Sequence, residues 1–134
     1  RTQRTPRRKG VEERDPLTAA VIGAAIEVHK LLGPGLLEVL YHRALRCELT
    51  LRGIPFRLEQ PVSVDYKGQN LGDDLRLDLV VADELIVELK AVDQLHPIHD
   101  AQLITYLKLT GLRKGLLLNF NVKLLKDGVK RIVL

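Results

Sequence analysis

The chain has 134 residues, a length typical of one domain, and 46% of them are hydrophobic, enough for one buried core. No run approaches the roughly 18 consecutive apolar residues of a membrane-spanning helix, and no apolar segment follows the basic N-terminus as in a secretory leader. The one cysteine, Cys47, excludes a disulfide framework and a four-cysteine zinc site. We therefore expect a cytoplasmic protein that makes no membrane contact.

The formal charge of +4 comes from the first ten residues, which hold five arginines and lysines and no acid. Without them, 16 basic and 17 acidic side chains remain, so the rest of the chain is near neutral. A basic segment can contact phosphates by charge alone, but a segment with nothing apolar to bury is also typical of disorder. We expect residues 1–15 to be a disordered basic tail and residues 16–134 to be a single domain.

Two helices are predicted first. Asp15 and Pro16 are typical of a helix start, and apolar residues then recur every three or four positions. The first helix is expected over 16–32 and ends at the Gly33-Pro34-Gly35 segment. A second helix with a leucine-rich stripe is expected over 35–52, with Cys47 packed in the core.

The period then changes from helix to strand. Apolar and polar residues alternate over 56–66, which predicts a strand with one wet face. Further strands are expected over 75–81, 85–92 and 115–119, and a third long helix over 97–110. The segments 122–125 and 129–134 are expected to flank a turn at residues 126–128. The order ααβββαββ predicts an α/β fold with a mixed sheet flanked by helices.

Two acids and a lysine occupy suggestive positions on neighbouring strands. Glu88 and Lys90 are two residues apart, so they project from the same face of a strand. If residues 82–84 form a three-residue loop, the register places Asp78 directly opposite Glu88, whereas a two-residue loop would not.

Opposed carboxylates destabilise a sheet unless something offsets their repulsion. A divalent cation does so, since Mg²⁺ takes oxygen ligands and commonly binds one or two carboxylates together with water and phosphate. Lys90 could then orient water or stabilise charge on phosphorus. The alternative is a salt-bridged sheet face, with Lys90 neutralising Asp78 and Glu88 and no metal present.

Several segments, in the same order, resemble one family. Gly35-Leu36-Leu37-Glu38-Val39-Leu40-Tyr41 matches the GxxExxY signature, Asp78 with Val87-Glu88-Leu89-Lys90-Ala91 matches its D…VELKA segment, and Ala101-Gln102-Leu103-Ile104-Thr105-Tyr106-Leu107 is similar to its AQLxxYL helix. From about residue 16 to the C-terminus the chain resembles the GxxExxY proteins, a branch of the PD-(D/E)XK nuclease superfamily.

The resemblance implies a restriction-endonuclease-like core that cleaves nucleic acid with Mg²⁺ or Mn²⁺. It implies that Asp78, Glu88 and the Leu89 carbonyl hold the metal, that Lys90 is the catalytic lysine, and that Glu38 completes the metal shell. It also implies that Gln102 and Tyr106 contact substrate. Tyr41 shares a helix face with Glu38, so we expect it to contact substrate as well. A carboxylate among leucines is costly to bury without a partner, which favours a functional Glu38.

Histidines offer weaker alternatives. His96 and His99 are three apart and could bind zinc, but the sequence supplies no third ligand beside them. His29 is expected to be structural, capping the turn at Gly33.

The expected function is therefore Mg²⁺-dependent hydrolysis of nucleic-acid phosphodiesters, with DNA as the substrate. A chain this short has little room for a recognition domain, so a homodimer or a protein partner is expected. The alternative from another class is a non-catalytic interaction module of the same fold that a protein partner recruits.

Overall fold

A computed structural model describes residues 15–134, so the predicted basic tail lies, except for Asp15, outside the described residues. Within them the helices are α2 (Pro16–Leu32), α3 (Glu38–Leu51) and α4 (Pro97–Thr110), with a short 3₁₀ turn η1 (Leu125–Gly128). The strands are β1 (Phe56–Val62), β2 (Asp65–Tyr66), β3 (Gln69–Asn70), β4 (Leu75–Val81), β5 (Leu85–Lys90), β6 (Lys114–Asn119) and β7 (Val129–Val133).

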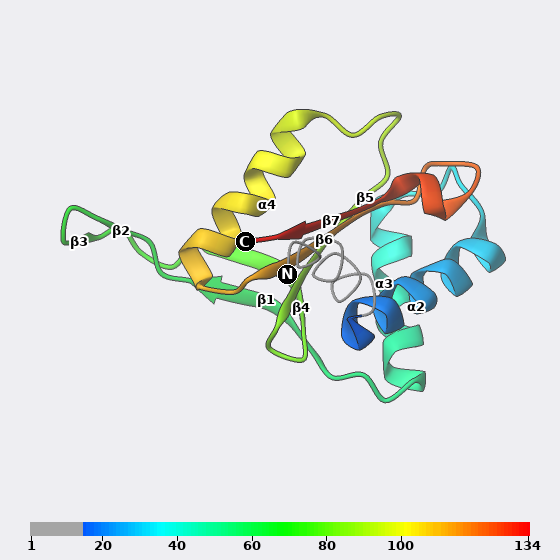
Figure 1. Cartoon of the computed structure of the whole chain (residues 1–134), viewed down its shortest axis with the longest axis horizontal. Coiled ribbons are helices and arrows are strands. Elements are labelled where there is room, and N and C mark those ends of the chain that lie inside the picture. The colour runs from blue at the N-terminus through cyan, green and yellow to red at the C-terminus, as the bar shows by residue number, and fades with distance from the viewer. Residues whose placement is uncertain (1–14) are drawn as a thin grey trace, which may run out of the picture.

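The main sheet is mixed, as predicted. Its five strands in the described part of the chain run in the order β1-β4-β5-β6-β7, and the pairs are antiparallel except for β5 with β6. The parallel pair requires a long crossover, which α4 provides. Strands β2 and β3 form a separate small hairpin that projects from the end of β1 (Figure 1).

Helices cover both faces of this sheet. Helices α2 and α3 pack on one face, where Leu45 and Phe120 are fully buried in the larger cluster of apolar side chains. Helix α4 packs on the other face, where Leu103 and Leu107 meet the second cluster (Figure 1). The result is an α/β fold of three layers, as expected for a restriction-endonuclease-like core.

The first and third helices have the predicted bounds for local reasons. The Asp15 carboxylate accepts a hydrogen bond from the Thr18 amide at 3.2 Å, and Pro16 occupies the first helical position of α2. Helix α4 likewise begins at Pro97 and ends at Gly111, whose left-handed backbone closes it.

Other predictions need correction. The strand predicted over 56–66 divides into β1 and β2, and α3 begins only at Glu38. The turn expected at residues 126–128 is the 3₁₀ turn η1, and the segment 122–125 before it forms no strand. Leu125 is buried beneath α2, and the Val122 carbonyl lies 2.8 Å from His29 Nε2 in a hydrogen bond. Cys47 is exposed on α3 and does not pack in the core.

None of the described helices is long and apolar enough to cross a bilayer.

Candidate active site

The turn between β4 and β5 sets the register on which the site depends. Ala82 and Asp83 have left-handed backbones, with φ of 52° and 57°, and Val81 pairs with Leu85 across a three-residue loop. The ladder continues to Leu79 opposite Val87, where the recorded pairing ends. One further step in the same register would place Asp78 opposite Glu88, which is the pairing that the sequence predicts, but the ladder ends before that step.

Glu88 is the electrostatic centre of the site. The residue is only 6% exposed, yet within residues 15–134 its carboxylate accepts no hydrogen bond and forms no ion pair. Burial first, then the charge of Asp78 and more weakly that of Glu38, together raise the pKa of Glu88 to about 7 against the opposing effect of Lys90. A buried carboxylate without a partner is costly, so this position favours a cation that the chain itself does not supply.

Lys90 lies two residues further along β5 and is half-buried. Among the described residues it forms no ion pair with Asp78, Glu88 or any other acid. The structure therefore does not show the salt-bridged face that was the alternative interpretation. Its charge still acts on Glu88, because it lowers the pKa of that carboxyl. The ammonium group remains available for a ligand.

Helix α3 brings Glu38 toward the site from its first turn. Glu38 is the first residue of the helix, and its charge raises the pKa of Glu88, so the two carboxylates lie within electrostatic reach. The side chain is exposed, however, and the expected burial cost does not arise.

Tyr41 has a structural place that the sequence did not indicate. It is fully buried, its ring stacks on Phe120 at 4.7 Å between centroids, and it is not placed to contact a substrate. Its hydroxyl donates to the Gly33 carbonyl at 2.6 Å and accepts from the Leu36 amide at 3.0 Å. Tyr41 therefore fixes the loop that leads into Glu38, and it takes the turn-capping part that was expected of His29.

Helix α4, on the face of the sheet opposite to α3, carries the two predicted substrate contacts Tyr106 and Gln102. Tyr106 is half-buried, and its pKa is raised by burial and then by the charges of Glu88 and Asp78, so its hydroxyl lies within electrostatic reach of both acids. Gln102 lies one turn earlier on the same helix and is exposed. It makes no hydrogen bond within the described part of the chain, so the structure does not bring it to the acids directly.

The acidic side chains of the site suit a divalent cation only in part. Residues 15–134 contain no group of three or more histidine, cysteine, aspartate or glutamate side chains arranged to hold one, so Glu38 does not join Asp78 and Glu88 in a single cluster. The Leu89 side chain is buried, so this residue has only its main-chain carbonyl to offer. Two carboxylates, one of them buried without a partner, fit a hard divalent cation whose remaining ligands are water and phosphate.

Sequence reasoning missed Asn119, the last residue of β6, which pairs in register with Lys90. Its buried amide accepts from the Val92 amide at 3.0 Å and donates to the Val92 carbonyl at 2.9 Å, while the Phe120 amide donates to the Lys90 carbonyl at 2.9 Å. These bonds hold the chain directly after Lys90. An asparagine that ends a buried apolar run was the signal that could have indicated this role.

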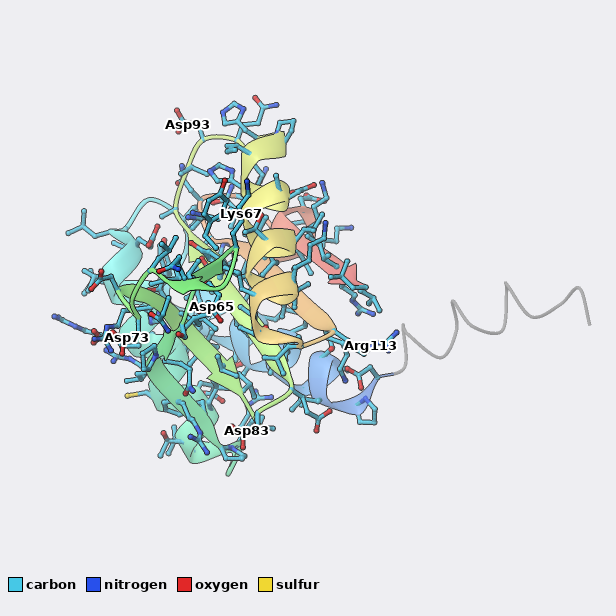
Figure 2. All side chains as sticks on the ribbon, turned by 90° about the vertical axis from the view of Figure 1, so that its left-hand side faces the viewer. Asp65, Lys67, Asp73, Asp83, Asp93 and Arg113 are labelled. Carbon is cyan, nitrogen blue, oxygen red and sulfur yellow. The ribbon has the colours of Figure 1, made fainter. Side chains whose placement is uncertain are left out.

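The histidine pair near α4 is used locally. His99 Nδ1 accepts from the His96 amide at 2.9 Å, and the His99 amide donates to the His96 carbonyl at 2.9 Å, so the two residues close the start of the helix. No third ligand is gathered with them in the part of the chain that the structure describes, which leaves the zinc alternative unsupported. Asp93, in the loop between β5 and this helix, lies at the end of the molecule opposite Asp83 (Figure 2).

Comparison with known proteins gives one result. The model of the family described as the PD-(D/E)XK nuclease superfamily matches residues 15–132. No curated protein and no solved structure matches the chain significantly.

Proposed function

We propose, from the premise that this chain belongs to the PD-(D/E)XK nuclease superfamily, that it hydrolyses phosphodiester bonds of DNA with Mg²⁺ or Mn²⁺ as its cation. Membership itself implies nuclease activity, a nucleic-acid substrate and, in general, a divalent metal. The observation that supports the site most is the buried carboxylate of Glu88, which is unpaired among the described residues and whose pKa the charge of Asp78 helps to raise.

Each residue then has a distinct part. Asp78, Glu88 and the Leu89 carbonyl hold the cation, which, when bound, polarises a phosphoryl oxygen and lowers the pKa of a bound water. Lys90 orients the attacking water and stabilises the negative charge that develops on phosphorus. Glu38 lies nearby and biases the charge of Glu88. Tyr106 and Gln102 contact the phosphate backbone of the substrate from α4.

We further place the chain in the GxxExxY branch, with residues 16–134 as one nuclease domain. The support is the arrangement of the signature itself: Tyr41 ties the loop at Gly33 and Leu36, and Glu38 begins the helix beside the acids. The signature tyrosine therefore has a structural reason to accompany the glutamate.

Metal binding provides the first test. Wild type should gain thermal stability with Mg²⁺ or Mn²⁺, by about 2.7 kcal/mol at a hundredfold excess over Kd, and Asp78→Asn should lose this gain. Asp73→Asn, an exposed aspartate just before β4, is the matched control and should respond like wild type. No response of wild type to either ion would contradict the metal site.

A substrate panel provides the second test. Supercoiled plasmid, single- and double-stranded DNA, and RNA are incubated with Mg²⁺, Mn²⁺ or EDTA, and DNA should be cut only with metal. Cleavage of RNA alone would correct the substrate. Metal binding without any cleavage would favour the interaction module, and the search would then turn to a protein partner or a second copy of the chain.

A further inference from the structure

Glu59 has an unusual backbone for its position. Its φ is +49°, a left-handed value that non-glycine residues rarely adopt, and it lies in the middle of the edge strand β1. The other described non-glycine residues with positive φ are Lys67, Ala82 and Asp83, and all of them lie in turns. A strained residue inside a strand persists only where its surroundings hold it, and such residues concentrate at functional sites.

The register places this residue opposite Asp78. Leu58 pairs with Leu79 and Gln60 pairs with Leu77, so the positions between them, Glu59 and Asp78, face each other across the two strands. This is the step that the otherwise continuous β1–β4 ladder omits.

Both strands change faces at this step. Leu77 and Leu79, two apart, would share a face in a regular strand, but Leu77 packs in the α4-side cluster and Leu79 in the α2/α3-side cluster. On β1, Leu58 lines a hollow with α3, whereas Gln60 lines one with the end of α4. The β1–β4 ribbon therefore turns over at Glu59 and Asp78.

The neighbouring ladder ends at the same level. Strand β4 is paired with β5 only as far as Leu79 and Val87, immediately before Asp78 and Glu88. Asp78 thus lies where β4 leaves regular pairing with both β1 and β5. The strict alternation of side chains between the two faces of the sheet therefore does not fix the direction of its side chain.

We propose that the left-handed backbone of Glu59 positions Asp78 for cation binding by turning the β1–β4 ribbon over at this pair. This role rests on the proposed function, in which Asp78 is a metal ligand. The backbone conformation of Glu59 has this role, and its side chain does not. The exposed Glu59 carboxylate is not among the charges that act on Glu88, and it forms no ion pair with other described residues. Glu59 is therefore a positioning residue.

Four substitutions separate backbone from side chain. Glycine and asparagine accept left-handed φ, so Glu59→Gly and Glu59→Asn should keep wild-type Mn²⁺ affinity by calorimetry, as should the charge-neutral Glu59→Gln. Valine strongly disfavours that conformation and favours a regular strand, so Glu59→Val should weaken Mn²⁺ binding by about 10- to 100-fold, the usual loss when the support of a metal ligand is removed.

Lys67→Val is the matched control for strain. Lys67 has the same φ of +49° but lies in the turn of the projecting β2–β3 hairpin (Figure 2). The Lys67→Val variant should have a Tm in EDTA that is lowered about as much as that of Glu59→Val, while its Mn²⁺ affinity stays at the wild-type value. If Glu59→Val does not fold, Glu59→Thr, also β-branched, takes its place with the same expected ranking.

Three results would overturn the inference. They are a wild-type Mn²⁺ affinity in Glu59→Val, a loss of affinity in Glu59→Gln, and an equal loss in Lys67→Val. If wild type itself binds no cation and cuts nothing, the proposed function fails instead, and a crystal structure of Glu59→Val decides the structural claim. A negative φ at residue 59 with Leu77 moved to the α2/α3 face supports it, and an unchanged Leu77 refutes it.

Discussion

The buried carboxylate of Glu88 predicts an unusual pH dependence of stability when no divalent cation is present. Its pKa rises from 4.5 to about 7 on folding, first because of burial and then because of Asp78. Between these two values the folded state keeps the proton that the unfolded chain has lost. The free energy of unfolding should therefore fall as the pH rises from 4.5 to 7, and level off above.

The magnitude follows from the shift. A change of this size corresponds to about 3 kcal/mol between the two protonation states, and the residue is only 6% exposed, so solvent screening reduces it little. In Glu88→Gln the glutamine side chain has nearly the same shape as the glutamate side chain but does not ionise. In EDTA it should be about 3 kcal/mol more stable than wild type at pH 8, with the advantage vanishing near pH 4.

Urea unfolding in EDTA from pH 4 to pH 8 measures this difference. Glu27→Gln on α2 serves as a control for the removal of one negative charge, and its curve should run parallel to that of wild type. Saturating Mg²⁺ at pH 8 should stabilise wild type and not Glu88→Gln. If the wild-type and Glu88→Gln free energies keep a constant separation across this range, the assignment of a buried, unpaired carboxylate is refuted.

Three further substitutions test the supports of the site by urea unfolding. Tyr41→Phe removes two hydrogen bonds but keeps the stacking on Phe120, so it should cost about 1–2 kcal/mol; no loss would show that the loop before Glu38 does not depend on the hydroxyl. Asn119→Ala removes the side-chain partners of the Val92 amide and carbonyl, so it should lower the free energy of unfolding by about 1–3 kcal/mol and slow cleavage. Cleavage at the wild-type rate would show that Asn119 does not support the chain after Lys90. Gly128→Ala should be among the most damaging changes, since its Cβ would lie 2.1 Å from the Asn119 carbonyl oxygen, and an unaltered Tm would contradict this packing.

Much of the fold follows from local sequence signals. The Asp15–Pro16 start and the apolar period predict α2 over its full length, and the turn at residues 82–84 gives the register that pairs Val81 with Leu85. These features depend on neighbours along the chain, which is why the sequence reveals them.

The remainder depends on tertiary packing. The run after β6 is apolar enough for a strand, but burial of Leu125 under α2 and the close approach of Gly128 to Asn119 turn it into η1. Tyr41 resembles a substrate contact by its spacing from Glu38, and only the folded loop shows that its hydroxyl is already used. The left-handed backbone of Glu59 has no local signal, since glutamate is not typical of that conformation.

Cleavage of supercoiled plasmid tests the central claim most directly. The account predicts nicking by the purified chain with Mg²⁺ and none with EDTA. Lys90→Ala should lose the activity, while Lys108→Ala, an exposed lysine on α4, should keep it. Cleavage that survives in Lys90→Ala at the wild-type rate, or that persists in EDTA, would contradict a metal-dependent site built on Asp78, Glu88 and Lys90.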